Sequence, residues 1–302
     1  MASSRGSRDL VWRVEAFFYD LASALLRALP VDWVSDTGGA LFRVIGPFTS
    51  SHRIAARNLE LAFPELDAAA RAELLKAQWD SVGRTFFEFP ITDRLTPASG
   101  RVEVIGGERL AEIAAKGEAV VFVSGHFSNW EVMPLTIVQS GVVCQMTYRA
   151  ANNPYVDARI KASRARYGVR LFAPKGGEGS RELLQSMGRG ESVALMNDQK
   201  FNGGVEAPFF GHPSHTAAGP TRLALRFGSV LQPMSVQRTR GARFKVIVHE
   251  PIRLEATGNR TADLEAGVRQ VNAFVEARIR ERPAEWFWVH KRWPRELYER
   301  PA

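Results

Sequence analysis

The spacing of apolar residues changes near residue 100 and divides the chain into two parts. From about residue 10 to 95, apolar positions recur every three or four residues, the spacing of helices with one buried face. Pro64 is placed to end one of these helices, and Asp67 to cap the next. Helices are predicted over 11–30 and around 38–45, 52–63 and 67–87.

Beyond residue 100, short apolar runs alternate with helical patterns. The unbroken run Ala119 to Val123 is typical of a strand buried on both faces of a sheet. The predicted strands are 102–105, 119–123, 142–148, 169–172, 192–196, 230–237 and 244–248. The predicted helices are 107–116, 154–167, 180–187, 219–227 and 261–282. This alternation indicates an α/β fold, with a mixed, largely parallel sheet flanked by helices and a helical N-terminal extension. We therefore predict a helical region over 1–95 and an α/β domain over 96–302.

The helix predicted over 11–30 has features of a segment that lies at a membrane surface. It is rich in Trp, Phe and Tyr, and four charges interrupt it, so it is a poor membrane-spanning helix. We interpret it as an amphipathic helix that associates with a membrane. Packing against the core of a soluble domain is an equally good interpretation of this segment.

The composition indicates which classes of partner the protein can bind. The formal net charge of +8 favours anionic ones: lipid headgroups, nucleic acid or an acidic carrier protein. Nucleic acid fits poorly, because the basic residues are spread along the whole chain without a recognisable nucleic-acid-binding motif. Cys144 is the only cysteine, so no intrachain disulfide can form, and its apolar neighbours predict a buried, inert thiol.

The candidate catalytic residues directly follow the strand predicted at 119–123. His126 lies in the turn and Glu131 at the start of the next helix, where ligands of open α/β sheets gather. A turn between them allows Glu131 to accept a hydrogen bond from one imidazole nitrogen, leaving the other to take a proton from a hydroxyl. Ser128 and Glu131 also have the spacing of a capping box, in which Glu131 only serves the helix end.

Several motifs in order resemble one enzyme family. The segment 125–131, Gly-His-Phe-Ser-Asn-Trp-Glu, is similar to the His-x4-Asp/Glu motif of glycerolipid acyltransferases, in the version of the bacterial lipid A late acyltransferases. Further resemblances to this family are Asn-Leu-Glu-Leu-Ala-Phe-Pro at 58–64, Tyr-Arg at 148–149, Asn-Asp-Gln at 197–199, Pro-Phe-Phe-Gly at 208–211 and the Trp-rich segment 286–293. They cover most of the chain, and the ordered set is far more specific than the first motif alone.

The resemblance implies a reaction and roles for particular residues. His126 would deprotonate a hydroxyl of a lipid A precursor, which attacks the thioester of an acyl carrier protein, with Glu131 holding the histidine. Arg149 would contact either the developing oxyanion or a phosphate. Asn129, Asp198 and Gln199 are expected to line the same cleft, and capping the turn after their strand is the alternative for the last two.

Two other segments contain residues that could bind a phosphate or a metal ion. Lys175 opens a glycine-rich turn before a helix, which suits phosphate binding, although a flexible loop is the simpler interpretation. His212 and His215 lack a nearby carboxylate pair, so we expect no metal site. No cofactor is expected either.

The resemblance places the protein at the cytoplasmic face of the bacterial inner membrane. Two alternatives stay open. One is an acyltransferase acting on another glycolipid or lysolipid. The other is a non-catalytic peripheral membrane protein of the same fold.

Overall fold

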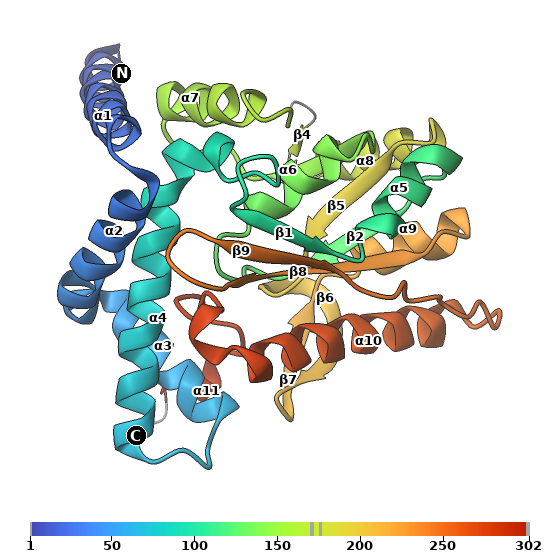
Figure 1. Ribbon diagram of the computed structural model, residues 1–302. Coiled ribbons are helices and arrows are strands. Elements are labelled where there is room, and N and C mark those ends of the chain that lie inside the picture. The colour runs from blue at the N-terminus through green and yellow to red at the C-terminus, as the bar shows by residue number, and fades with distance from the viewer. Residues whose placement is uncertain (1, 170–171, 175–176, 300–302) are drawn as a thin grey trace.

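A computed structural model describes residues 2–169, 172–174 and 177–299 and shows one large sheet (Figure 1). Its strands are β1 (Val102–Ile105), β2 (Val121–Ser124), β3 (Cys144–Tyr148), β4 (Phe172–Pro174), β5 (Ser192–Met196), β8 (Leu231–Arg238) and β9 (Phe244–Val248). Their order across the sheet is β1-β9-β8-β2-β5-β3-β4. Within this sheet only β8 and β9 pair antiparallel, so the sheet is mixed and largely parallel, as predicted.

Helices cover both faces of this sheet. They are α5 (Gly107–Lys116), α6 (Val132–Gln139), α7 (Pro154–Ala165), α8 (Gly177–Gly188), α9 (Gly219–Phe227) and α10 (Arg260–Glu281), followed by the short α11 (Glu296–Glu299). Successive residues of β2 point to opposite faces. Val121 and Val123 pack in one cluster with side chains of α8, α9 and α10, whereas Phe122 packs in another with side chains of α5 and α6. Burial on both faces explains why β2 is apolar throughout.

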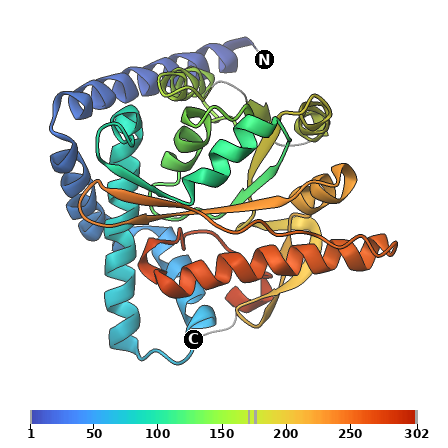
Figure 2. The same cartoon turned by 45° about the vertical axis from the view of Figure 1, so that its right-hand side comes forward.

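The N-terminal helices stand against one end of the sheet (Figures 1 and 2). They are α1 (Ala2–Ala28), α2 (Val31–Ile45), α3 (Ser50–Ala62) and α4 (Ala68–Glu88), with 3-10 turns η1 (Gly46–Phe48) and η2 (Phe89–Arg94). The Asp67 side chain caps α4 by accepting a hydrogen bond from the Ala70 N–H at 2.7 Å, as predicted. Among the described residues, no helix is long and apolar enough to span a membrane.

The fold class is therefore confirmed, including the helical N-terminal extension; a domain boundary near residue 95 stays a prediction. One element differs from the sequence-based prediction. Residues 200–216, for which the sequence predicted neither strand nor helix, form an antiparallel pair, β6 (Lys200–Phe209) with β7 (His212–Thr216). Phe210 and Gly211 connect them with φ of 50° and 75°, the left-handed conformation of a tight two-residue hairpin turn.

His249, directly after β9, makes the fold sensitive to acid. Burial, with help from the charges of Arg278 and Arg109, lowers the pKa of His249 to about 4 from its ordinary 6.5. Its Nε2 lies 2.8 Å from the Ser235 hydroxyl. Because the unfolded chain then binds more protons, the free energy of unfolding should fall as the pH drops from 6.5 towards 4. Urea unfolding at several pH values should show a shallower fall in His249→Gln; an identical fall in both proteins would contradict this.

Candidate active site

The register of the sheet brings two polar side chains together at the carboxyl end of neighbouring strands. Ser124 at the end of β2 pairs with Met196 at the end of β5. His126 and Asp198 each follow two residues later. The Asp198 side chain is almost fully buried, and the His126 side chain keeps 18% of its surface exposed. One group is thus fixed inside the protein and the other is open to a substrate.

Asp198 holds the loop that contains His126 at two points. One carboxylate oxygen lies 2.8 Å from the imidazole Nδ1 of His126, and the other accepts the His126 backbone N–H at 2.7 Å. The second oxygen also accepts the indole N–H of Trp286 at 2.8 Å. Burial raises the pKa of Asp198, but the interactions with His126 and Trp286 outweigh it, so its pKa lies well below the usual range. An ionised carboxylate only accepts hydrogen bonds, so Nδ1 carries a proton, and in the neutral imidazole Nε2 is the nitrogen with the free lone pair.

Glu131 does not make the predicted hydrogen bond to the imidazole, and this part of the interpretation is wrong. Its carboxylate instead faces α7, where Arg164 donates two hydrogen bonds and the Tyr167 hydroxyl donates one at 2.8 Å. The physical reason is that Asp198 already occupies Nδ1, while the guanidinium offers a bidentate, charge-assisted partner. Burial raises the pKa of Glu131, but its interactions with Arg164 and Tyr167 outweigh this and lower the pKa overall. A catalytic role for Glu131 stays a prediction.

The capping-box alternative also does not hold. The Ser128 hydroxyl is buried without a hydrogen-bond partner among the described residues, and φ of Ser128 is 44°. Its backbone N–H is donated to the carbonyl of Glu285 at 2.7 Å, and the Phe287 N–H to the carbonyl of His126 at 3.1 Å. The loop that carries His126 is thus bound by backbone hydrogen bonds to the C-terminal segment, which holds His126 in a fixed position.

Asn129, predicted to contact substrate, lies fully buried beneath the loop. Its amide donates to Glu88 at 3.0 Å, and its side-chain oxygen accepts the backbone N–H of Glu131 at 3.2 Å. Glu88 is also fully buried and accepts two hydrogen bonds from Arg238, at 2.6 and 2.9 Å. This network joins the end of α4, the end of β8 and the His126 loop. Its geometry assigns Asn129 a supporting position.

Removing one partner from this buried network should be costly. In Glu88→Gln, Arg238 would keep its charge without a carboxylate, which costs about 3–5 kcal/mol of unfolding free energy for a buried pair. Urea unfolding monitored by circular dichroism measures it. Glu73→Gln, an exposed glutamate on the same helix, is the matched control and should change stability by less than about 0.5 kcal/mol. Equal, small effects of both changes would contradict the role given to Glu88.

The structure describes two of the other three predicted site residues. Arg149 directly follows β3 and is exposed. Gln199 is half-buried next to Asp198. Lys175 falls outside the described residues. Binding of substrate by Arg149, Lys175 and Gln199 stays a prediction. Cys144 is buried, as expected, and burial raises the pKa of its thiol.

Aromatic rings pack near the imidazole of His126. The ring of Trp130 lies 5.0 Å from the imidazole and that of Phe287 6.4 Å, measured between centroids. The rings continue through Phe86, 5.9 Å from Phe287, to Phe42 on α2, 6.0 Å from Phe86. A half-exposed apolar track of aromatic rings thus leads from the N-terminal helices to the imidazole. The motif at 125–131 did not predict this track.

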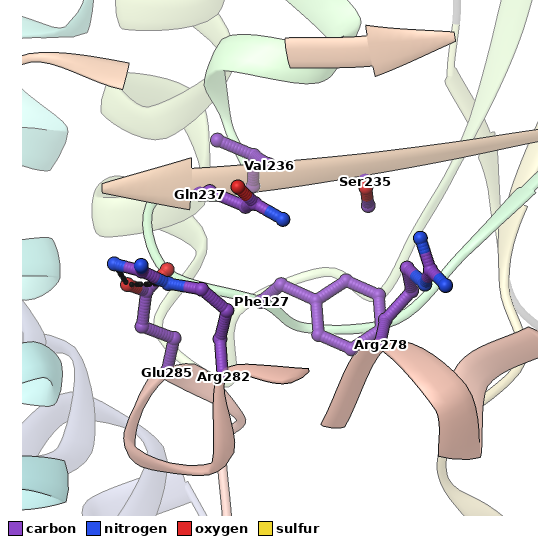
Figure 3. Close-up of a pocket in the computed structure, with 7 residues that line it drawn as sticks. All are labelled: Phe127, Ser235, Val236, Gln237, Arg278, Arg282 and Glu285. Atoms are coloured by element: carbon purple, nitrogen blue, oxygen red, sulfur yellow. Dashed lines mark hydrogen bonds and ion pairs between the residues drawn. The ribbon is translucent and has the colours of Figure 1, made fainter. Parts of the chain in front are cut away.

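Two cavities in the described part of the chain lie away from these residues. One of about 10 Å³ lies behind Phe127, between β8 and α10, and is large enough for about one water molecule (Figure 3). Another of about 370 Å³ lies near the opposite end of β2 and is lined by charges of both signs. Neither contains a predicted site residue. Among the described residues, no group of three or more His, Cys, Asp or Glu side chains is placed to hold a metal ion.

Comparisons with known proteins show the family of this chain. The family model described as bacterial lipid A biosynthesis acyltransferase matches residues 6–295. The lipid A biosynthesis lauroyltransferase of Escherichia coli (strain K12) is 26% identical over 250 residues, covering 80% of this chain and 78% of that protein. A phosphatidylinositol mannoside acyltransferase of Mycobacterium tuberculosis (strain CDC 1551 / Oshkosh) is also 26% identical, over 285 residues, covering 91% and 87%.

Among solved structures, the 1-acyl-sn-glycerophosphate acyltransferase of Thermotoga maritima is similar, with a TM-score of 0.38 and 13% identity. The match covers 78% of this chain and 96% of that one. The family model matches nearly the whole length, including every motif that carried the resemblance. The chain therefore belongs to the bacterial lipid A biosynthesis acyltransferase family and is an acyltransferase.

Proposed function

We propose that this enzyme transfers a fatty acyl group from an acyl carrier protein thioester to a hydroxyl of a lipid A precursor, adding a secondary acyl chain. The observation that carries the proposal is the pairing of His126 with Asp198. With Nδ1 bound to Asp198, Nε2 is the nitrogen of the neutral imidazole that can take a proton, and the ring lies beside an apolar track. Such a site can activate an alcohol that arrives with the substrate, and it needs no nucleophile of its own.

The chemical steps follow from this geometry. The Nε2 of His126 takes the proton of the acceptor hydroxyl as its oxygen attacks the thioester carbonyl carbon. The tetrahedral intermediate then collapses, the carbon–sulfur bond breaks, and the imidazolium returns the proton to the leaving thiolate. Asp198 stays ionised throughout. It stabilises the imidazolium and holds its orientation, while the free thiol of the carrier departs.

The choice of donor and acceptor rests on charge and on the relatives. The basic surplus of +8 suits an acidic carrier protein and a phosphorylated acceptor. The Escherichia coli and Mycobacterium tuberculosis relatives are both 26% identical to this chain, and their names carry different acceptors. A phosphatidylinositol mannoside is therefore the rival acceptor.

A competition assay tests donor and acceptor together. Purified protein receives equal concentrations of both acceptors, with either acyl carrier protein or coenzyme A as the thioester carrier. We expect the acylated lipid A precursor to dominate, with the carrier protein as the preferred donor. Preferential acylation of the mannoside would overturn the acceptor, and preference for coenzyme A would overturn the donor.

We further propose that the enzyme binds the cytoplasmic face of the inner membrane through its N-terminal apolar face. Most of the exposed large apolar side chains of the described residues gather on α1, α2 and η1. This face consists of Leu10, Val11, Val14, Phe17, Phe18, Leu21, Leu25, Leu29, Trp33, Leu41, Val44, Ile45 and Phe48. The aromatic track described above begins at α2, so an acyl chain entering from the bilayer would meet rings up to His126.

Membrane binding should therefore depend on the large rings of this face. The triple variant Phe17→Ser, Trp33→Ser and Phe48→Ser removes rings that are 62%, 68% and 87% exposed. Because each ring would transfer apolar area into lipid, partitioning onto vesicles containing phosphatidylglycerol should fall by about 10-fold or more in co-sedimentation. Phe227→Ser, on α9, is the control and should partition like the native chain. Unchanged binding by the triple variant would contradict the assignment of this face.

A further inference from the structure

Arg292 is a fully buried charge that forms no ion pair with a carboxylate in the described part of the chain. Its guanidinium donates hydrogen bonds to neutral groups only: the hydroxyls of Ser214 and Thr216, the side-chain oxygen of Asn272 and the carbonyl of His215. Its Nε has no partner among the described residues. Burying a cation in this way is costly, and costly arrangements that break the usual rules tend to be kept where function needs them.

The position of Arg292 relates it to the catalytic histidine. Its guanidinium lies 4.5 Å above the ring of Phe209, which packs 5.9 Å from the ring of Trp286. Trp286 donates its indole N–H to Asp198. These contacts lead from the guanidinium through two rings to the buried Asp198 carboxylate. Burial lowers the pKa of Arg292 to about 10, and the charges of Asp198 and Tyr298 act in the opposite direction.

We propose that Arg292 is the buried counter-charge of Asp198, a positioning residue that keeps His126 neutral and able to accept a proton. A buried carboxylate beside an imidazole favours the imidazolium, which cannot act as a base. A cation behind the carboxylate offsets that field while leaving the hydrogen bond to Nδ1 intact. The site then keeps the orientation that Asp198 provides, and His126 is not held permanently protonated.

Other charges near His126 do not supply this offset. Glu131 interacts electrostatically with the imidazole, but it is already paired with Arg164. The ring of His290 lies 6.4 Å away from that of His126. Neutralising Arg292 should therefore act through Asp198 and favour protonation of His126, whereas a purely structural role would leave the titration unmoved.

The test follows the titration of His126 by NMR in the full-length, nitrogen-15-labelled protein, with the resonance assigned from His126→Gln. In Arg292→Gln the midpoint should move to higher pH, by on the order of one unit. Arg292→Lys keeps the charge and should titrate like the native chain. A midpoint unmoved in Arg292→Gln, or moved equally in both variants, would overturn the proposal.

A second measurement covers the case in which Arg292 variants fail to fold. In Asp198→Asn the cation remains without its partner, so the His126 midpoint should fall clearly below that of an ordinary histidine, about 6.5. A midpoint at or above that value would overturn the proposal. The proposal rests on the proposed function only for the reason why His126 must be able to accept a proton. The titration needs no substrate, so failure of acyl transfer in the native protein would overturn that function and leave the counter-charge intact.

Discussion

Replacing His126 with glutamine should lower kcat of acyl transfer by about 10²–10⁴-fold, the range expected for loss of a general base. The amide has nearly the size of the imidazole and can still hydrogen-bond, but it cannot take up a proton. KM should change far less, because the aromatic rings that would contact the acyl chain remain. Initial rates with a labelled acyl donor measure both constants.

His249→Gln is the matched control for this prediction. It changes another histidine of the same domain, one that the site does not use, and above pH 7 it should transfer acyl groups at the native rate. The native enzyme should also lose activity in acid, because a protonated imidazole cannot accept a proton. A His126→Gln variant within about threefold of the native kcat would exclude His126 as the base.

Asp198→Asn should have an effect of similar size through a different cause. The asparagine side chain keeps the shape, but it no longer requires the proton to sit on Nδ1 of His126. The tautomer with a free Nε2 is then no longer enforced, and the imidazolium loses its counter-charge. We expect kcat to fall by about 10²–10⁴-fold with the fold retained. Steady-state kinetics and thermal unfolding together separate loss of chemistry from loss of structure.

Glu131→Gln should leave the tautomer of His126 unchanged, unlike Asp198→Asn, because the structure pairs Glu131 with Arg164 and not with His126. Nitrogen-15 NMR should find the proton of neutral His126 on Nδ1 in Glu131→Gln, as in the native protein, and redistributed between the two nitrogens in Asp198→Asn. If Glu131→Gln alone changed the tautomer, the carboxylate that holds the imidazole would be Glu131, as the sequence first suggested.

The sequence predicted the fold well because its signals are local. The unbroken apolar run before His126 marks a strand buried on both faces, and Asp67 marks the start of α4. The hairpin of β6 and β7 was missed because glycines and prolines interrupt its alternation: Gly203, Gly204, Pro208 and Pro213. Its best signal was the pair Phe210 and Gly211, which takes up the tight turn.

The partner of His126 could not be predicted in the same way, because it depends on strand order. Asp198 lies 72 residues from His126 in the chain. The two meet only because β5 inserts between β2 and β3, a contact that no local pattern encodes. Once that order is known, the register Ser124 to Met196 places both residues two positions beyond their strands. Glu131, five residues from His126, was the nearer candidate, but its side chain pairs with α7.

The most direct test of the account is the mass of the lipid formed when the purified protein meets acyl carrier protein thioester and a tetra-acylated lipid A precursor. The account predicts a product heavier by one acyl chain, formed by the native protein and reduced to trace amounts with His126→Gln. No acylated lipid from the native protein, under conditions where the protein is folded and bound to vesicles, would contradict the proposed reaction.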